Sequence, residues 1–337
     1  MEVGSSLIRM SKAIASEMVA IRSAVRASLE KLEPGEKVIV ACSGGADSLA
    51  LSFALAKEAP KLAIEVIGVT IDHQLQAKSG EQAARVLEQF AEMGISISEI
   101  VRVNVELIDG MEASARRARY KALRATADKF GAVRVFLGHT QNDQAETVLL
   151  GLARGSGTRS LSGMAEESEI YLRPLLAITR DQSVGACAEV GLTPWEDPQN
   201  EDPSFLRVRL RAQALPALES AIGPGVTSAL ARTAGLARDD ADALDEWALR
   251  EYADFEPGSL EIERLVTLPK AVRTRVLRLA IYAAGAPTGS LSADHVGAVE
   301  ALVTEWHGQG EVSLPGGVKA GRLSGRLSLL PQPVKAM

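Results

Sequence analysis

Short apolar runs alternate with longer helical patterns between about residue 37 and residue 152, and this alternation constrains the fold more than any other feature of the chain. The helical patterns lie near 47–58, 80–92, 112–129 and 142–152. Strands separated by helices in this way predict a doubly wound α/β domain, in which helices cover both faces of a parallel sheet. The expected strands are rich in β-branched residues and comprise Val38–Val40, Val66–Ile71, Ile100–Val105 and Val133–Leu137.

The flanking segments have different patterns. Residues 5–32 carry apolar positions at helical spacing and predict one amphipathic helix that ends at Pro34-Gly35. From about residue 216 helical patterns dominate, until a glycine-punctuated, β-like tail at 311–330. A chain of 337 residues is long enough for two domains. We therefore expect an N-terminal helix at 1–33, the α/β domain at 34–216 and a mostly helical second domain at 217–337.

Composition argues against several classes of protein. Cys42 and Cys187 are the two cysteines, far apart and without a C-x-x-C pair, which argues against a disulfide framework, an iron–sulfur site and a zinc ribbon. No stretch approaches the ~18 apolar residues of a membrane span, and the charged N-terminal segment has no signal-peptide core. We expect a cytoplasmic protein with no membrane partner. The net charge of −6 argues against a general DNA coat but leaves room for local RNA-binding patches.

The first strand exit carries a glycine-rich segment, Ser43-Gly44-Gly45-Ala46-Asp47-Ser48, between a buried strand and a helix. Ligands of doubly wound sheets bind beyond such strand ends, and the N–H groups of a helix start bind phosphate. The glycines let the backbone approach the phosphate oxygens, the serines add hydroxyl groups, and Asp47 can hold a Mg²⁺ ion that bridges phosphates. The structural alternative is a Gly-Gly turn with Ser and Asp as helix caps.

Two further strand exits carry polar side chains. Ile71-Asp72-His73 follows the second strand, and His139 follows the fourth. On a helix that begins near Asn142, Asp143 and Glu146 share a face one turn beyond His139. Two carboxylates and an imidazole can bind an ammonium group and accept its proton. The alternative is a solvated helix start, where acidic residues are favoured by the helix dipole.

These motifs, in their order, resemble a known family. Ser43–Ser48 resembles the S-G-G-x-D-S signature of the PP-loop ATP pyrophosphatases, which cleave ATP between the α and β phosphates to adenylate a substrate. The ordered resemblance to tRNA(Ile)-lysidine synthetases covers about residues 36–216, and the tail around Leu314–Gly317 resembles that family's C-terminal part. The segments that carry it are Ile71–Leu75, Ala115–Tyr120, His139–Leu149, Arg154–Gly157, Arg173–Leu176, Glu196–Pro198 with Asn200, and Arg207–Arg211 with Pro216.

The resemblance implies an ATP-dependent ligase that modifies tRNA. In that family the wobble cytidine of an isoleucine tRNA with a CAU anticodon is adenylated at its C2 oxygen, and free L-lysine then displaces AMP to form lysidine. ATP and Mg²⁺ are the implied cofactors, and tRNA(Ile) and lysine are the implied partners; a homodimer remains open. The implied catalytic residues are Asp47, Arg116, Arg119, His139, Asp143 and Glu146, and the implied ATP-binding residues are Ser43, Gly44, Gly45, Ala46, Asp47, Ser48, Ile71 and His73, with Asp47 also the Mg²⁺ ligand.

Two positions depart from the family pattern. Asn142 stands where the family has the first Asp of its D-D-Q-A-E-T segment, which puts in doubt any role that needs a carboxylate there. Val208 replaces the Asn of a basic string and leaves three arginines around it.

Two arginine-rich segments are candidates for RNA contact. Residues 264–281 contain five cations and no acid, although pairing with the acidic run at 239–246 explains them equally well. The arginines near 207–211 share one face only if that segment is extended, and fan out if it is helical. The candidate RNA-binding residues are Arg207, Arg209, Arg211, Lys270, Arg273, Arg275 and Arg278.

Two alternative functions remain at this point. One is another PP-loop adenylating enzyme, such as a tRNA thiolase or an amidotransferase-linked synthetase; the paired cysteines that such a thiolase needs are not evident here. The other is a nucleotide-binding regulatory module without chemistry, which would not need His139, Asp143 and Glu146.

Overall fold

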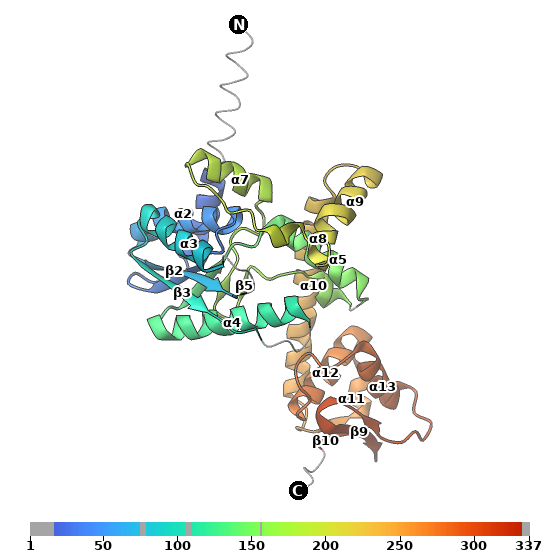
Figure 1. The fold of residues 1–337 in the computed structure, drawn as a ribbon. Coiled ribbons are helices and arrows are strands. Elements are labelled where there is room, and N and C mark those ends of the chain that lie inside the picture. The colour runs from blue at the N-terminus through green and yellow to red at the C-terminus, as the bar shows by residue number, and fades with distance from the viewer. Residues whose placement is uncertain (1–16, 75–78, 106–109, 156, 332–337) are drawn as a thin grey trace. The chain divides into compact units, whose positions relative to one another are not determined.

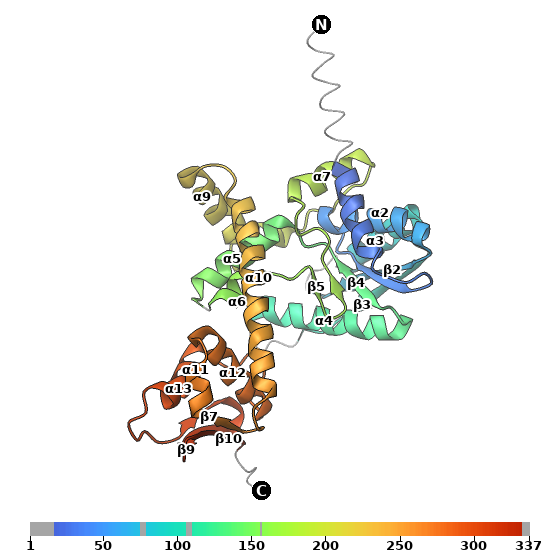
Figure 2. The same ribbon diagram turned by 180° about the vertical axis from the view of Figure 1, so that it is seen from behind.

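The computed structural model describes residues 17–74, 79–105, 110–155 and 157–331, apart from the side chains of residues 199, 200 and 331. They form two compact units, each described here by itself (Figures 1 and 2). The first extends to Gly155 and includes Ser160–Gly235; the second joins the short stretch before Ser160 to the residues from Leu236 onward. The division falls inside one continuous helix, α10 (Val226–Ala253). The domain limits at 33/34 and 216/217 remain predictions.

A six-stranded sheet in the order β3-β2-β1-β4-β6-β5 organises the first unit. All neighbouring strands are parallel except the pair β5 and β6 at one edge. The doubly wound parallel sheet predicted from the sequence is therefore confirmed. The strands are β1 (Lys37–Ala41), β2 (Glu65–Asp72), β3 (Ile97–Arg102), β4 (Arg134–Leu137), β5 (Glu167–Ser168) and β6 (Tyr171–Leu172).

Strand β1 shows how the sequence builds two cores around this sheet. Val38 and Val40 point into one core, which they share with helices α2 (Ala46–Glu58), α3 (Ser79–Met93) and α7 (Arg180–Glu189). Ile39 and Ala41 point into the opposite core, which they share with helix α4 (Met111–Phe130). Because side chains alternate along a strand, an uninterrupted apolar run needs helices on both faces. Figures 1 and 2 show α4 on one side of the strands and α2 and α3 on the other.

Helices connect the strands and extend the unit beyond the sheet. Those expected near 47–58, 80–92, 112–129 and 142–152 are all confirmed within a residue or two. Segment η3 is a π-helical continuation of α8. The elements of this region are α2 (Ala46–Glu58), η1 (Ala59–Leu62), α3 (Ser79–Met93), α4 (Met111–Phe130), α5 (Gln141–Ala153), α6 (Thr158–Leu161), α7 (Arg180–Glu189), η2 (Pro198–Glu201), α8 (Leu206–Arg209), η3 (Leu210–Ala214) and α9 (Leu215–Ile222).

The N-terminal helix is confirmed for residues 17–29, while the rest of the expected segment, 5–16, lies outside the described residues. The helix ends at Leu29, three residues before the expected end at residue 32. Its apolar face is buried at Met18, Ile21, Val25 and Leu29. Glu58, at the end of α2, has a fully buried side chain that pairs with cations of this helix and of η1. This carboxylate therefore fixes the helix to the sheet unit.

The second unit joins the end of α10 to three helices and a four-stranded antiparallel sheet in the order β7-β10-β9-β8. Buried Val276, Leu277, Val299 and Leu327 contribute to its core. The β-like tail is confirmed, whereas β7 was not predicted because three residues show no clear period. The elements are β7 (Ser259–Glu261), α11 (Ile262–Thr267), α12 (Lys270–Ala283), α13 (Ala293–Thr304), β8 (Val312–Ser313), η4 (Pro315–Gly317), β9 (Val318–Leu323) and β10 (Arg326–Pro331).

Across the described parts of the chain, no helix combines the length and the apolar character needed to cross a bilayer.

Candidate active site

The glycine-rich segment after β1 forms a closed loop at the start of α2. Ser48 organises it, because its hydroxyl donates to the carbonyl of Gly45 at 3.0 Å and accepts from the N–H of Ser43 at 3.2 Å. Gly45 is the N-cap of α2 and contributes no side chain, so the first-turn amides of that helix face the loop. This arrangement makes the positive end of α2 a site for an anion.

Two glycines allow the close packing around this loop. Gly44 has φ +88°, and a Cβ atom there would lie 2.4 Å from Nε2 of Gln82. A Cβ atom on Gly138, at the end of β4, would lie 3.0 Å from backbone atoms of Asp47 and Ser48. Sequence reasoning missed Gly138; a glycine between a buried strand and a polar motif was the available signal.

A cavity of about 400 Å³ opens over the loop. Most of the predicted site residues line it. They come from helix α4 and from the chain that follows β1, β2 and β4, as expected of a doubly wound sheet. Tyr120, Met164 and Arg180 also line it and were not among the candidate residues. The candidates that line it are Ser43, Gly45, Ala46, Asp47, Ser48, His73, Arg116, Arg119, His139, Asp143, Arg207 and Arg211.

Asp47 faces this cavity with an unsatisfied oxygen. Its Oδ1 atom is buried and has no hydrogen-bond partner within the described structure. The pKa of Asp47 is raised to about 6, mainly by burial; a hydrogen bond with Ser183 opposes the shift, and the nearby charge of Asp143 adds to it. A buried carboxylate oxygen without a partner is a position that a cation can occupy.

Arginines dominate the electrostatics of the cavity. Arg119 makes no ion pair with another described residue, and burial lowers its pKa, with a further contribution from Arg116. Burial also lowers the pKa of His139 well below its usual value, and the charges of Arg119 and its neighbours add to this. His73 shifts in the same direction, again mainly through burial and then through Arg119. Both imidazoles are therefore neutral at pH 7, and the cationic cavity favours a polyanion.

Asp143 and Glu146 share a face of α5, as predicted, but they have different environments. Asp143 lines the cavity, and its Oδ2 atom accepts from the N–H of Thr140 at 2.8 Å. The side chain of Glu146 is fully buried and does not line the cavity. Its Oε1 atom accepts from Nε of Arg211 at 2.8 Å, and Arg207 lies 3.4 Å from Oε2. Burial raises the pKa of Glu146 although Arg211 opposes the shift.

The arginines of the basic string lie on a helix and fan out. Arg207 and Arg211 are one turn apart on the continuous segment formed by α8 and η3, and both point toward α5. Arg209 points elsewhere and donates to the carbonyls of Pro203 and Ser204. Their helical arrangement brings Arg207 and Arg211 to the cavity over the Ser43–Ser48 loop.

Asn142 has a structural role at the position where the family pattern has an acid. Its Oδ1 atom accepts from the N–H of Arg180, the first residue of α7, at 2.9 Å. Asn142 does not line the cavity. An amide oxygen and a carboxylate oxygen can both accept this bond, so the departure from the pattern leaves the cavity unchanged.

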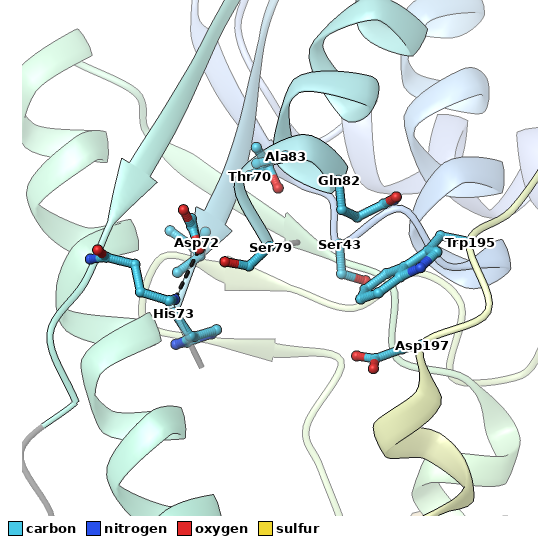
Figure 3. A pocket seen from close by; sticks show the side chains of 11 residues that line it. Ser43, Thr70, Asp72, His73, Ser79, Gln82, Ala83, Trp195 and Asp197 are labelled. Carbon is cyan, nitrogen blue, oxygen red and sulfur yellow. Dashed lines mark hydrogen bonds between the residues drawn. The ribbon is translucent and has the colours of Figure 1, made fainter. Parts of the chain in front are cut away.

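A second cavity of about 130 Å³ lies beside the Ser43–Ser48 loop (Figure 3). Ile71 lines it, together with polar groups of β2 and α3 and Trp195 from the chain after α7. Ser43 and His73 line both cavities, which are therefore adjacent. Gly44, the remaining predicted ATP-binding residue, contributes its carbonyl, which accepts the N–H of Trp195 at 2.8 Å.

Both cysteines are buried beneath the loop. Sγ of Cys42 lies 3.4 Å from Oγ of Ser48, and the thiol of Cys187 donates to the carbonyl of Ala46 at 3.4 Å. Neither cysteine lines the cavity over the Ser43–Ser48 loop.

Most cations of the basic segment 264–281 pair with acids of their own unit. Arg275 lies 2.6 Å from Asp245, within the acidic run, and Lys270 and Arg273 both pair with Glu300. Arg264 likewise pairs, with Glu251 and Asp254. Arg278 makes no ion pair with a described residue.

Family comparisons agree with this geometry. Residues 18–218 match the PP-loop domain family, and residues 260–328 match the TilS substrate binding domain family. The first family uses ATP. The two matches correspond to the sheet unit and to the second unit.

Curated relatives cover nearly the whole chain. The tRNA(Ile)-lysidine synthase of Thermobifida fusca is 50% identical over 309 residues, which is 91% of this chain and 95% of the relative. That of Streptomyces coelicolor is 54% identical over 295 residues, 86% of this chain and 84% of the relative.

A solved structure shares the fold. U34-tRNA thiolase NcsA from Methanococcus maripaludis superposes with a TM-score of 0.55 at 18% identity, over 66% of this chain and 78% of that one. At this identity the likeness shows the fold alone. The resemblance drawn from the motifs is confirmed by the curated relatives: the chain belongs to the tRNA(Ile)-lysidine synthase family.

Proposed function

We propose that this protein joins free L-lysine to C2 of the wobble cytidine in a CAU-anticodon tRNA(Ile). The tRNA is first adenylated by ATP, and the amine of lysine then displaces AMP. The observation that carries this proposal is the cavity over the phosphate loop, which combines an anion-binding helix start, unpaired cationic groups and carboxylates. The reaction with ATP accounts for Asp47 as a Mg²⁺ ligand. Binding of an amine accounts for a further carboxylate, Asp143, beside the arginines of the same cavity.

The phosphate loop and the arginines would hold the triphosphate. First-turn amides of α2 and the hydroxyl of Ser43 face the anion, and Arg116 and Arg119 stabilise the charge that develops as pyrophosphate leaves. The neutral imidazole of His139 accepts a proton more readily once phosphates compensate the arginine charges that lower its pKa.

Asp47 fits a Mg²⁺ ion, because its buried Oδ1 atom has no partner and carboxylate oxygen is the ligand that this ion prefers. No group of three or more His, Cys, Asp or Glu within the described residues is placed to hold a metal, so the phosphates would complete the coordination. When bound, the ion neutralises charge on the phosphate oxygens.

Asp143 would bind the ammonium group of lysine, since it lines the cavity close to His139. Glu146 would act as a positioning residue, because its buried carboxylate holds Arg207 and Arg211 at the cavity wall. Transfer requires the amine to lose a proton, for which Asp143 and His139 are the available acceptors.

The reaction itself tests the proposal. The protein would be incubated with ATP, Mg²⁺, labelled lysine and unmodified CAU-anticodon tRNA(Ile), with the same tRNA carrying another anticodon as the control. We expect label in the CAU tRNA only, with one AMP and one pyrophosphate per lysine joined. Without lysine, an adenylated tRNA should accumulate. Pyrophosphate release without any label in RNA would contradict the proposal.

A further inference from the structure

The second cavity combines an aromatic wall with polar groups. The indole of Trp195 lies across it beside Ser43 and Asp197, and Gln82 lies on the same side (Figure 3). The opposite wall is formed by the end of β2 with Asp72 and His73. A flat apolar ring flanked by polar groups suits a planar heterocycle.

Trp195 is held in place by backbone contacts. Its N–H donates to the carbonyl of Gly44 at 2.8 Å, which joins this segment to the phosphate loop. Two residues earlier, the carbonyl of Thr193 accepts from Nε2 of Gln89 on α3 at 3.1 Å. The backbone that carries the indole is therefore fixed without a ligand, which lowers the entropy cost of binding one.

Gln82 supplies hydrogen-bonding capacity that the protein itself does not use. The residue is buried at 9% exposure, and its side-chain amide makes no hydrogen bond with another described residue. Because the Gln82 side chain lines the cavity, its amide is available to a ligand there. One carbonyl oxygen and one NH₂ group match the acceptor nitrogen and the amino group on the edge of adenine.

We propose that Trp195 stacks on the adenine ring of ATP and that the amide of Gln82 recognises its edge. This inference rests on the proposed function for the identity of the nucleotide. Because Ser43 and His73 line both cavities, a nucleotide with its phosphates on the Ser43–Ser48 loop can reach the second cavity with its base. Trp195 and Gln82 thus determine nucleotide affinity and specificity, and the Gly44 contact couples base binding to the phosphate loop.

Equilibrium binding separates the two roles and needs neither tRNA nor lysine. ATP would be compared with purine riboside triphosphate, which lacks the amino group at C6. Trp195→Ala should weaken both nucleotides equally, by about 5- to 150-fold, the range that base stacking contributes. Trp195→Phe, which keeps an aromatic ring and the backbone bond, should recover most of the affinity. Gln82→Leu should remove the preference for ATP, which we expect to be roughly tenfold.

Tryptophan fluorescence gives an independent readout. ATP should change the emission of the wild type and of Trp247→Phe, but not that of Trp195→Phe, and inorganic pyrophosphate should change it little. In steady-state kinetics, Trp195→Ala should have a higher KM for ATP than the wild type and an unchanged KM for lysine. Unaltered ATP affinity in Trp195→Ala, or an unchanged ATP preference in Gln82→Leu, would overturn the proposal. If ATP binds as described but lysine is never transferred, the proposed function fails and the base-binding role stands.

Discussion

Asp47 combines a buried, unpartnered oxygen with a pKa raised to about 6, above the 3.8 of an exposed aspartate. The folded protein therefore takes up a proton at this site as the pH falls through 6, and a Mg²⁺ ion must displace that proton to bind. Below pH 6, the Mg²⁺ concentration needed for half-maximal pyrophosphate release should rise by up to about tenfold per pH unit.

Variants at Asp47 test this assignment. Asp47→Asn should abolish Mg²⁺-dependent pyrophosphate release without lowering the Tm, because it removes a charge whose burial is unfavourable. Asp181→Asn, which changes an exposed first-turn acid of α7, should behave as the wild type. Normal turnover in Asp47→Asn would exclude a metal role.

Asn142 stands where the family pattern has Asp, and substitutions test whether this difference matters. Asn142→Asp keeps an oxygen that accepts the N–H of Arg180, and its charge suits the positive start of α7. Its kcat/KM for ATP should stay within about twofold of the wild type. Asn142→Leu loses the acceptor and should cost roughly 1 kcal/mol in the free energy of unfolding. A large gain of activity in Asn142→Asp would instead assign chemistry to a carboxylate at this position.

At the scale of elements, Glu58 fixes the helix at 17–29 to the sheet unit. Burial alone would raise the pKa of Glu58, but hydrogen bonds from Lys61, Arg26 and Arg22 outweigh it and lower the pKa to about 2. A carboxylate with a lowered folded-state pKa stabilises the fold above its unfolded value of about 4.5, and this contribution is lost as the pH falls from 4.5 toward 2.

Glu58→Gln should lower the free energy of unfolding at pH 7 by about 2–3 kcal/mol. This is below the cost of breaking a fully buried pair, because the three cations are a third to a half exposed. Urea unfolding at pH 7 and pH 3 measures the free energy of unfolding of both proteins. The difference between Glu58→Gln and the wild type should be smaller at pH 3. An equal difference in free energy of unfolding at both pH values would mean that packing, and not charge, fixes the helix.

The sequence predicted the helices and strands that carry a sustained apolar pattern, and it missed the elements that are too short to show one. Strands β1, β2 and β4 lie close to the expected positions, and β3 begins at Ile97, three residues before the expected start. The two-residue strands β5 and β6 are too short for any period to show. RNA contact by Arg207 and Arg211 stays a prediction. Their ion pairs with the buried Glu146 could not be predicted, because local spacing does not show which side chains meet across the fold.

At the scale of the whole molecule, RNA affinity is expected to depend on cations that the protein has not already paired. On α12, Arg278 makes no ion pair with a described residue, whereas Arg275 lies 2.6 Å from Asp245. Arg278→Gln should therefore weaken tRNA binding and reduce the log–log salt slope by up to about one. Arg275→Gln, the matched control, should lower the stability of the second unit and leave the slope unchanged. An unchanged slope in Arg278→Gln would place the phosphate contacts elsewhere.

The reactivity of the two buried thiols reports local opening of the structure around them. Cys42 and Cys187 are the only cysteines of the chain, and they contact the Ser43–Ser48 loop at Ser48 and Ala46. Burial raises the pKa of both thiols, that of Cys187 to about 12, so a disulfide reagent can react only when the surrounding structure opens. The labelling rate therefore measures the opening equilibrium near the loop without an engineered probe, and a bound nucleotide should slow it in proportion to site occupancy.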